Sequence, residues 1–325
     1  ALNDTRYLSR VAKEYLTLIC PQNTRVIPGQ MTALLRAKFG LNNILGLDGL
    51  KNREDHRHHA IDACVIGVTD QGLLQRFANA SASARQKQVD KLVEHMPDPW
   101  PTYREHVQRA ISNIYVSHKP DHSYEGAMHE ETAWGLRPDG IASRRIRNEE
   151  DKREREDKKL NVIPFNSTRD QHRHGIDEHD NPKAYKGYLG GSNFCIDIVC
   201  NDKGKWEGEV VSTYTAYQLI RQLGKTKGEQ RLYSRTTSIS GKPLVMRLQI
   251  DDTLYMMENE RWRLMRVVKI GGNGQIFFAE HNEANVDARN RDKENPFTYV
   301  SKMAGSLQKT QARKVMVSPI GELKK

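Results

Sequence analysis

Two adjacent histidines precede an aspartate at the head of an apolar stretch, within the segment from Arg57 to Ala63. The residues from Ala60 to Val68 contain no proline and are predicted to be helical. On a helix, residues three and four apart share a face, so His59 and His58 are both placed beside Asp62. A carboxylate can hold Mg²⁺ while an imidazole takes a proton from water. This spacing is compatible with phosphodiester hydrolysis, although an isolated motif of this length is more often an ordinary solvated helical turn.

The elements that must position this motif are predicted to form a helical layer. The periodicity predicts an amphipathic helix from Thr5 to Leu18, a strand from Thr24 to Ile27 and a second helix from about Gln30 to Lys38. The motif helix is expected to continue to Phe77, with a break at Gly72. A short strand is expected at Tyr115 to His118.

Several short blocks resemble, in one order, the third RuvC segment of the CRISPR-associated RNA-guided endonucleases of the Cas9 family, type II-C members in particular. The motif His58 to Ala63 resembles the third RuvC motif itself. The resemblance is clearest over residues 1 to about 135, and the other blocks that carry it are Leu2–Tyr7, Gly29–Arg36, Phe39–Leu41, Pro99–Trp100, Val116–Pro120 and Gly126–Thr132.

This resemblance implies a fold and an active site. It implies an RNase H-like RuvC segment at 1–80 and a connection at 81–143. It also implies that Asp62 and His59 bind Mg²⁺, with Mn²⁺ as a substitute, and that His59 acts as base or metal ligand with His58 the weaker candidate. In the family the site also uses an Asp and a Glu from two earlier motifs, which are not recognisable here. The chain is therefore expected to be the C-terminal part of a larger nuclease and to require the missing N-terminal portion as a partner.

Composition narrows the class of protein and its compartment. The mean hydropathy of −0.75 argues against a membrane protein, and no apolar run approaches the roughly 18 residues that span a bilayer. The first ten residues lack the pattern of a signal peptide, so a prokaryotic cytoplasmic location without a membrane partner is expected. The formal net charge is +10, of which 13 basic and 6 acidic residues after position 260 contribute +7. A polyanionic partner is therefore favoured, with the basic surface near the C-terminus.

The second half of the chain changes character after a charged tract. Between Arg144 and Lys159, 8 basic and 6 acidic residues occupy 14 of the 16 positions, so 144–182 is interpreted as a linker or loop. Beyond Lys183 the apolar period becomes two, which predicts strands, with one helix at Tyr214–Leu223 and a hairpin turn at Gly271–Gly274. The predicted fold class is α+β, with a mainly helical RuvC fragment followed by a mainly antiparallel β domain at 183–325.

Four cysteines are too few and too scattered to indicate a disulfide framework. Cys195 and Cys200, together with His172, His174 and His179, are the nearest approach to a zinc site. The alternation around Cys195 instead favours a half-buried strand in which the cysteines pack as small apolar residues.

By resemblance, the β domain recognises the protospacer-adjacent motif (PAM) of target double-stranded DNA, while guide RNA (crRNA and tracrRNA) reads the remaining sequence. Side chains able to contact base edges or phosphates lie around the hairpin and before the last strand. Asn273, Gln275, Lys302 and Arg313 are the favoured readers, and each could equally be a turn residue or an ordinary surface charge. The DNA-binding candidates are Lys269, Asn273, Gln275, Thr298, Lys302, Gln308, Arg313 and, after the predicted short strand, Lys119.

Two further functions are compatible with the sequence. The chain by itself could be only a binding module, for duplex DNA or for an acidic anti-CRISPR protein that mimics DNA. In that case it would show no nuclease activity in isolation. A stand-alone RuvC-like resolvase or transposon nuclease would need its other carboxylates within these 325 residues, and no aspartate lies in a strand like that of the first RuvC motif.

Overall fold

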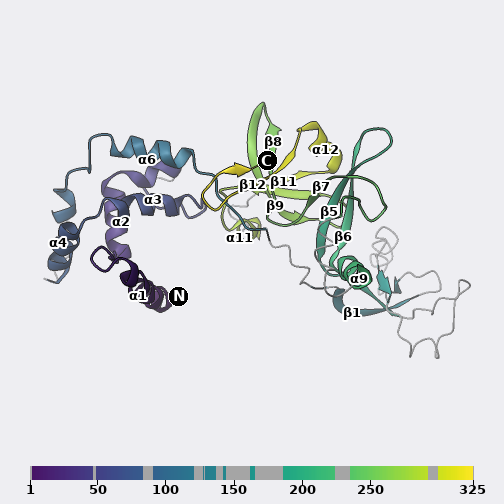
Figure 1. The fold of residues 1–325 in the computed structure, drawn as a ribbon, viewed down its shortest axis with the longest axis horizontal. Helices are drawn as coiled ribbons and strands as arrows, with labels where there is room; N and C mark the ends of the chain where they lie inside the picture. Colours follow the sequence, from purple (N-terminus) through teal and green to yellow (C-terminus); the bar gives the residue numbers. More distant parts are fainter. Residues whose placement is uncertain are drawn as a thin grey trace, which may run out of the picture. The chain divides into compact units, whose positions relative to one another are not determined.

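The computed structural model describes residues 2–46, 49–82, 91–120, 127, 129–136, 142–143, 162–164, 186–223, 235–291 and 299–324. The chain divides into two compact units (Figure 1). Unit 1 contains residues 1–116 together with 282–285, and unit 2 contains 117–281 together with 286–325. Four residues near the C-terminal end of the sequence are thus part of the helical unit. Most of the charged tract at 144–182, including His172, His174 and His179, lies outside the described residues.

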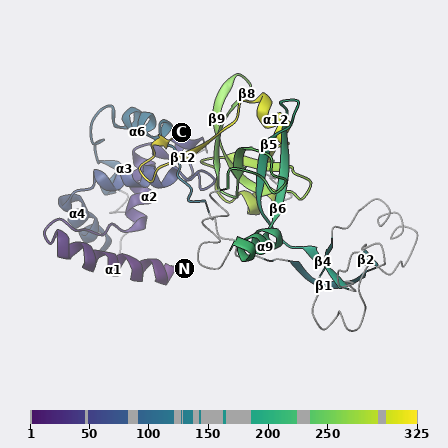
Figure 2. The same cartoon turned by 45° about the vertical axis from the view of Figure 1, so that its right-hand side comes forward.

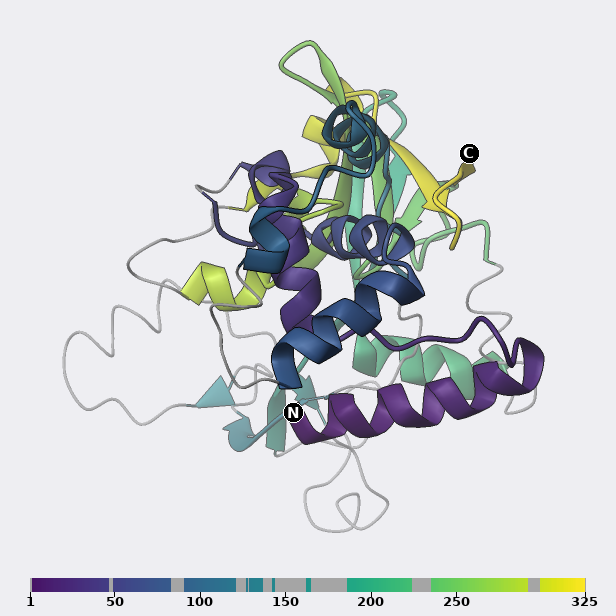
Figure 3. The same cartoon turned by 90° about the vertical axis from the view of Figure 1, so that its left-hand side faces the viewer.

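Unit 1 is helical, as the sequence predicts. The helix α1 (Leu2–Ile19) is the long purple helix that begins at the N-terminus in Figure 3. It is followed by α2 (Gly29–Lys38), the 3-10 helix η1 (Leu41–Leu45), α3 (His58–Gly67), α4 (Gln71–Ala82) and α6 (Tyr103–Ser112). The predicted strand at Thr24–Ile27 is wrong, because this segment is irregular.

The core of unit 1 joins α2, α3, α4 and α6. Met31, Leu41, Val65 and Ile111 are almost fully buried in it, at 0–1% exposed. The side chains of α1 that were expected to form an apolar stripe are instead exposed, with Tyr15 at 69% and Leu18 at 82%. The core therefore positions α3, and α1 contributes none of its buried residues.

The motif helix breaks earlier than predicted. It ends at Gly67, and α4 begins at Gln71, so Gly72 lies inside a helix. The Asp70 carboxylate accepts a hydrogen bond of 2.6 Å from the Leu73 backbone N–H, which satisfies a donor at the start of α4. Thr69 Oγ donates to the Val65 carbonyl at 2.8 Å. The break is therefore set by capping at Asp70 rather than by the glycine.

Unit 2 is built from antiparallel strands in three sheets. The largest has the order β11-β10-β9-β8-β12-β13 and comprises Val300–Lys302, Ile276–Glu280, Arg261–Ile270, Thr253–Glu258, Arg313–Val317 and Leu323–Lys324. A three-stranded sheet has the order β6-β5-β7 and comprises Trp206–Ser212, Asn193–Cys200 and Leu244–Leu248. A four-stranded sheet has the order β2-β1-β4-β3 and comprises Ala142–Ser143, His129–Leu136, Lys186–Gly190 and Val162–Pro164.

Helices of unit 2 cover or connect these strands. Figure 2 shows α9 (Thr213–Leu223) at the foot of the β5–β6 hairpin, where the predicted helix at Tyr214–Leu223 is confirmed. The short helix α11 (Val286–Arg291) follows β10, and the short helix α12 (Ala304–Lys309) follows β11. The main core includes Ile196, Leu254 and Phe278, each fully buried.

Three further details differ from the sequence-based expectation. β5 is buried over six consecutive residues rather than alternately, because its side chains pack into two core clusters, with Ile196 and Ile198 in one and Phe194 and Cys195 in the other. The strand β8 was not predicted. The expected strand at Tyr115–His118 is irregular, although side chains hold this segment: Ser117 Oγ donates to the Val317 carbonyl at 2.7 Å, and His118 Nε2 donates to the His281 carbonyl at 2.8 Å.

The structure of these strands does not support the zinc site considered for Cys195 and Cys200. β5 carries Cys195 and Cys200, and both are free thiols. Burial raises the pKa of Cys195, and the neighbouring Asp197 raises it further. Among the described residues there is no group of three or more His, Cys, Asp or Glu side chains that could hold a metal ion, and no helix long and apolar enough to cross a membrane.

Candidate nuclease site and nucleic-acid surface

Asp62 lies on α3 and is the centre of a small cluster of charges. Arg36 of α2 pairs with one carboxylate oxygen of Asp62, and Lys51 pairs with the other. Arg36 is itself oriented by Asn42, whose side-chain oxygen accepts from Nε at 2.6 Å. The Asp62 side chain is 20% exposed and that of Arg36 only 10%. Packing of α2 against α3 thus brings a buried arginine onto the motif aspartate.

The cations keep Asp62 ionised. Desolvation by burial raises its pKa, but the hydrogen bonds from Lys51 and Arg36 together lower the pKa below the ordinary value of an aspartate. Asp62 is therefore a carboxylate at neutral pH. An ionised and partly exposed carboxylate can accept from a donor or ligate a cation, so it is chemically competent for the role predicted from the sequence.

The two histidines at the start of α3 differ in their surroundings. Nδ1 of His58 donates to the Asp55 carbonyl oxygen at 2.6 Å, and His58 lines a cavity of about 10 Å³ with Arg36 and Lys51. Burial lowers the pKa of His58 and outweighs the hydrogen bond to Asp55 and the charge of Asp62, which raise it. His59 is exposed, and its ring lies 4.0 Å from the His58 ring between centroids. The structure therefore orders His58 and leaves His59 accessible to a substrate.

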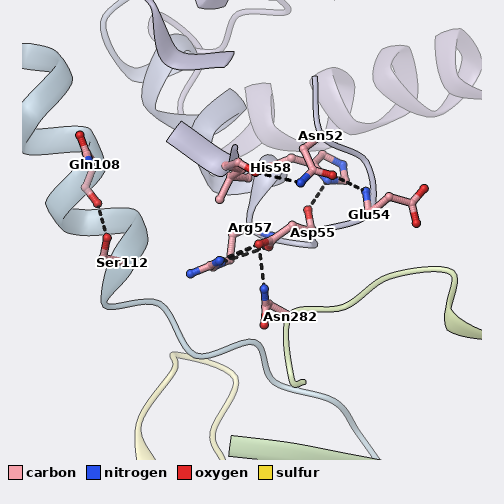
Figure 4. Close-up of polar contacts among 9 residues, drawn as sticks. Asn52, Glu54, Asp55, Arg57, His58, Gln108, Ser112 and Asn282 are labelled. Atoms are coloured by element: carbon pink, nitrogen blue, oxygen red, sulfur yellow. Dashed lines mark hydrogen bonds and ion pairs between the residues drawn. The ribbon is translucent and has the colours of Figure 1, made fainter. Parts of the chain in front are cut away.

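The turn before α3 is fastened by a buried aspartate, Asp55, which is 7% exposed (Figure 4). Its carboxylate accepts from Arg57 Nη2 at 2.6 Å, Arg57 Nε at 3.0 Å and the Arg57 backbone N–H at 2.9 Å. It also accepts from the Asn282 side-chain amide at 2.8 Å. Desolvation raises the pKa of Asp55, but these hydrogen bonds lower it overall. Asn282, a suitable DNA reader by residue type, is thus committed to this contact in unit 1.

The fit of this site to Mg²⁺ is partial. Mg²⁺ is usually held by one or two carboxylates with waters or substrate oxygens. Asp62 suits one such position because it is ionised and partly exposed, but both of its oxygens are engaged by Arg36 and Lys51. Within the described ranges the remaining ligands of a complete site are not brought together. Asp62, with His59 beside it on the same helix, is therefore at most a contributor to a metal site.

The candidate DNA readers of the hairpin lie at one end of the β9–β10 pair. Lys269 is exposed, with its ammonium 5.6 Å from the centroid of the Phe277 ring. Asn273 is exposed in the turn, where its side-chain oxygen accepts from the Gln275 N–H at 3.1 Å. The Gln275 amide donates to Ser301 Oγ at 3.0 Å. Asn273 therefore shapes the turn, while Lys269 remains accessible.

The other candidates divide into residues tied to the fold and residues that are exposed. Lys302 pairs with Glu258 at 2.6 Å. Gln308 bridges two backbone groups, accepting from the Trp206 N–H at 3.0 Å and donating to the Gly204 carbonyl at 2.8 Å. Arg313 and Lys119 are exposed. Thr298 lies outside the described residues.

Arg313 borders a groove in unit 2. The groove has a volume of about 490 Å³ and combines an apolar wall with amide and basic side chains. It is lined by Trp206, Val245, Met246, Gln308, Gln311, Ala312, Arg313 and Lys314. The Lys314 ammonium is engaged within the protein: it donates to the buried Asp252 carboxylate at 2.6 Å and to the Arg247 carbonyl at 2.8 Å. Arg313 is thus the basic side chain of this wall best placed to reach a ligand.

Sequence analysis did not identify three residues of the candidate site, namely Arg36, Lys51 and Asn282. Arg36 carried a usable signal, since a charged residue within the apolar pattern of α2 requires a buried partner. Lys51 was not distinguished from the other charges of its connection. The pairing of Asn282 with Asp55 spans 227 residues and has no local signal.

Comparisons with known proteins show similarity to a RuvC segment and to Cas9 endonucleases. The profile of the family described as RuvC endonuclease subdomain 3 matches residues 1–123. The CRISPR-associated endonuclease Cas9 of Campylobacter jejuni is 28% identical over 161 residues. That alignment covers 40% of this chain and 16% of the relative, so the chain spans only a small part of the length of the curated relative that it matches.

Solved Cas9 structures share the fold. The Type II-C Cas9 enzyme from Actinomyces naeslundii aligns over 98% of this chain and 46% of its own, with 14% identity and a TM-score of 0.60. Streptococcus thermophilus Cas9 in complex with the AGAA PAM aligns over 99% of this chain and 37% of its own, with 15% identity and a TM-score of 0.51. Residues 1–123 of this chain are therefore similar to RuvC endonuclease subdomain 3, and the fold of the chain is similar to that of the solved Cas9 structures.

Proposed function

We propose that this chain supplies one portion of the RuvC site of an RNA-guided DNA endonuclease, the site that cleaves the non-target strand. The observation that carries the proposal is the ionised, partly exposed carboxylate of Asp62, four and three residues after paired histidines on α3, within a matched RuvC subdomain. Mg²⁺, when bound, would supply Lewis-acid activation of water and stabilisation of the leaving oxygen. In an isolated chain the site is incomplete and no cleavage is expected.

The roles of this chain's own residues follow from their placement. Asp62 offers an oxygen ligand, and its charge is balanced by Arg36 and Lys51 until a cation replaces them. His59, exposed at the start of α3, accepts the proton of the attacking water or reaches the metal. His58, whose Nδ1 is engaged with the Asp55 carbonyl, is the weaker candidate for proton transfer.

We further propose that unit 2 recognises the PAM of target double-stranded DNA and that guide RNA is a partner. Support comes from the net charge of +10 and from the groove bordered by exposed Arg313. A Campylobacter jejuni Cas9 with a TM-score of 0.50 to this chain was solved in complex with sgRNA and target DNA. With these partners, we propose a location in the cytoplasm of a prokaryote.

Complementation tests the nuclease proposal. This chain would be mixed with an N-terminal Cas9 portion that carries the first two RuvC motifs, a cognate guide and Mg²⁺, and nicking of each DNA strand would be measured. Nicking of the non-target strand should appear with the native chain and disappear with Asp62→Ala, while Asp98→Ala, an exposed control in unit 1, should nick normally. Nicking that persists in Asp62→Ala would refute the role of this carboxylate.

A binding module is the second candidate function, favoured by the basic charge after position 260 and by the groove of unit 2. The isolated chain would then bind duplex DNA, or an acidic inhibitor protein that mimics it, without cleaving. Duplex binding that weakens steeply with salt, together with failure of complementation, would favour this function alone.

A further inference from the structure

A short antiparallel pairing holds the turn that carries the two histidines. The His56 N–H donates to the Asn282 carbonyl at 2.8 Å, and the Ala284 N–H donates to the Glu54 carbonyl at 2.8 Å, on either side of a bridge between Asp55 and Glu283. All of these residues belong to unit 1. The backbone of residues 54–56 is therefore fixed by a segment more than 220 residues away in the sequence.

The side chain of Asn282 completes this attachment. It is 8% exposed and donates at 2.8 Å to Asp55, which is 7% exposed and also receives Arg57 (Figure 4). When a buried carboxylate loses a hydrogen-bond donor, its negative charge is left partly unsatisfied away from water, which is energetically unfavourable. Removing the Asn282 amide should therefore make the position of the Asp55 side chain less well defined, before any effect on the histidines.

Asp55 transmits its position to His58 through its backbone carbonyl. That oxygen accepts from the His58 N–H at 3.1 Å and from His58 Nδ1 at 2.6 Å. A carbonyl oxygen can only accept, so Nδ1 carries the hydrogen and, in the neutral ring, Nε2 does not. The ring of His58 is thus fixed in both orientation and tautomer.

His59 rests against this fixed ring, with the two centroids 4.0 Å apart and the planes inclined at 38°. His59 itself is exposed, and its contact with the His58 ring restricts where its imidazole lies. We infer that Asn282 is a positioning residue for His59, acting through Asp55 and His58. The inference rests on the proposed function only where it assigns chemistry to His59.

Imidazole NMR on the whole chain tests this without any cleavage assay. With ¹⁵N-labelled histidine at about pH 8.5, two units above the ordinary imidazole pKa of about 6.5, the protonated and unprotonated ring nitrogens have well-separated shifts. His58, identified by loss of its signals in His58→Gln, should show hydrogen on Nδ1. Hydrogen on Nε2 in the native chain would overturn the inference without the need for any positioning variant.

The variant Asn282→Ala should then cause loss of the shift separation in His58, as the two tautomers interconvert, and a change in the ring proton shifts of His59. Asn23→Ala, an exposed control in unit 1, should leave both unchanged. If Asn282→Ala does not fold, Asn282→Leu removes the donor at similar volume and adds no charge beside Asp55. A folded variant whose His58 and His59 signals match the native chain would refute the positioning role.

Nuclease activity does not enter these measurements, so the two proposals can fail separately. Loss of the His58 tautomer in Asn282→Ala would stand even if Asp62→Ala had no effect on nicking. Conversely, Asp62-dependent nicking that is the same in Asn282→Ala and native protein, with unchanged histidine signals, would leave the nuclease proposal intact and reject the role of Asn282.

Discussion

Arg36 and Asp62 form an ion pair between α2 and α3, and each of the two residues is bound to a further side chain. Arg36 is fixed by Asn42, and Asp62 also pairs with Lys51. The motif aspartate is thus held by two cations of different accessibility, since the side chain of Arg36 is 10% exposed and that of Lys51 is 23% exposed. Lys51 is the partner that can be removed with less disturbance of the core.

Lys51→Ala should raise the pKa of Asp62 toward the ordinary value of about 3.9. Two hydrogen bonds lower this pKa, and the one from Lys51 lowers it more than the one from Arg36. In the variant, the desolvation that raises the pKa would remain. A carboxyl ¹³C NMR titration measures the change, with Arg53→Ala as an exposed control. An unchanged Asp62 titration in Lys51→Ala would show that Arg36 alone determines the ionisation.

The stability of unit 1 should fall as the pH drops below about 4. The folded-state pKa values of Asp55 and Asp62 are lowered, so their contribution is present above the unfolded pKa of about 3.9 and is lost as the pH falls through the folded values. Asp55→Asn should reduce the slope of the unfolding free energy against pH. Urea unfolding followed by circular dichroism between pH 3 and 6 measures it.

The exposed Asp98 supplies the control for this pH dependence. Asp98→Asn removes a carboxylate from unit 1 without removing a buried hydrogen-bond acceptor, so its slope should match that of the native chain. Equal slopes in native protein and Asp55→Asn would contradict the assignment of acid sensitivity to Asp55.

Arg247→Ala should destabilise unit 2 by about 3–5 kcal/mol, because it leaves the Asp197 carboxylate buried without its partner. Asp197 is fully buried and accepts from Arg247 Nε at 2.6 Å and Nη2 at 3.0 Å. The double variant Asp197→Leu with Arg247→Met should lose far less stability, since no charge remains buried. Chemical denaturation measures both, and Arg261→Ala is an exposed control. A small loss in the single variant would mean that water reaches Asp197.

Arg313→Ala should weaken duplex binding, and the dependence of affinity on salt should fall by about one unit of slope if Arg313 contacts a phosphate. Gln308→Ala should instead destabilise the β5–β6 turn by about 1 kcal/mol, because Gln308 is bonded to Trp206 and Gly204. Fluorescence anisotropy at several salt concentrations and thermal unfolding separate the two effects. Lys203→Ala is the exposed basic control, and an equal loss of binding with it would remove the assignment of Arg313.

Local patterns predicted much of the fold, because helices and hairpins depend on nearby residues. The helix at α2, the helix α9 and the turn at Gly271–Gly274 follow from periodicity and turn residues. The helix break was predicted at Gly72 but lies after Gly67, because the Asp70 carboxylate caps the start of the next helix, α4. Gly72 is accommodated inside α4. The burial of β5 on both faces depends on the two core clusters that its side chains join, which its own sequence does not reveal.

The candidate site likewise has features that the local sequence predicts and features that depend on distant residues. Placement of His58, His59 and Asp62 on one helix follows from their spacing, and the structure has them all on α3. The contacts that give these residues different properties come from distant segments: Arg36 from α2 and Asn282 from beyond β10. Spacing along one helix cannot distinguish the ordered His58 from the exposed His59, since that difference is made by the Asp55 carbonyl.

The attachment of Asn282 to Asp55 has a consequence for the order in which the protein folds. Closing a loop of 227 residues carries a larger entropic cost than closing the short loops between the helices of unit 1, so this pairing should form late. During synthesis, α3 leaves the ribosome long before residue 282 exists. The histidine turn should therefore mature only after residue 282 has been made, which would delay the ordering of the candidate site until much of the basic β region is also present.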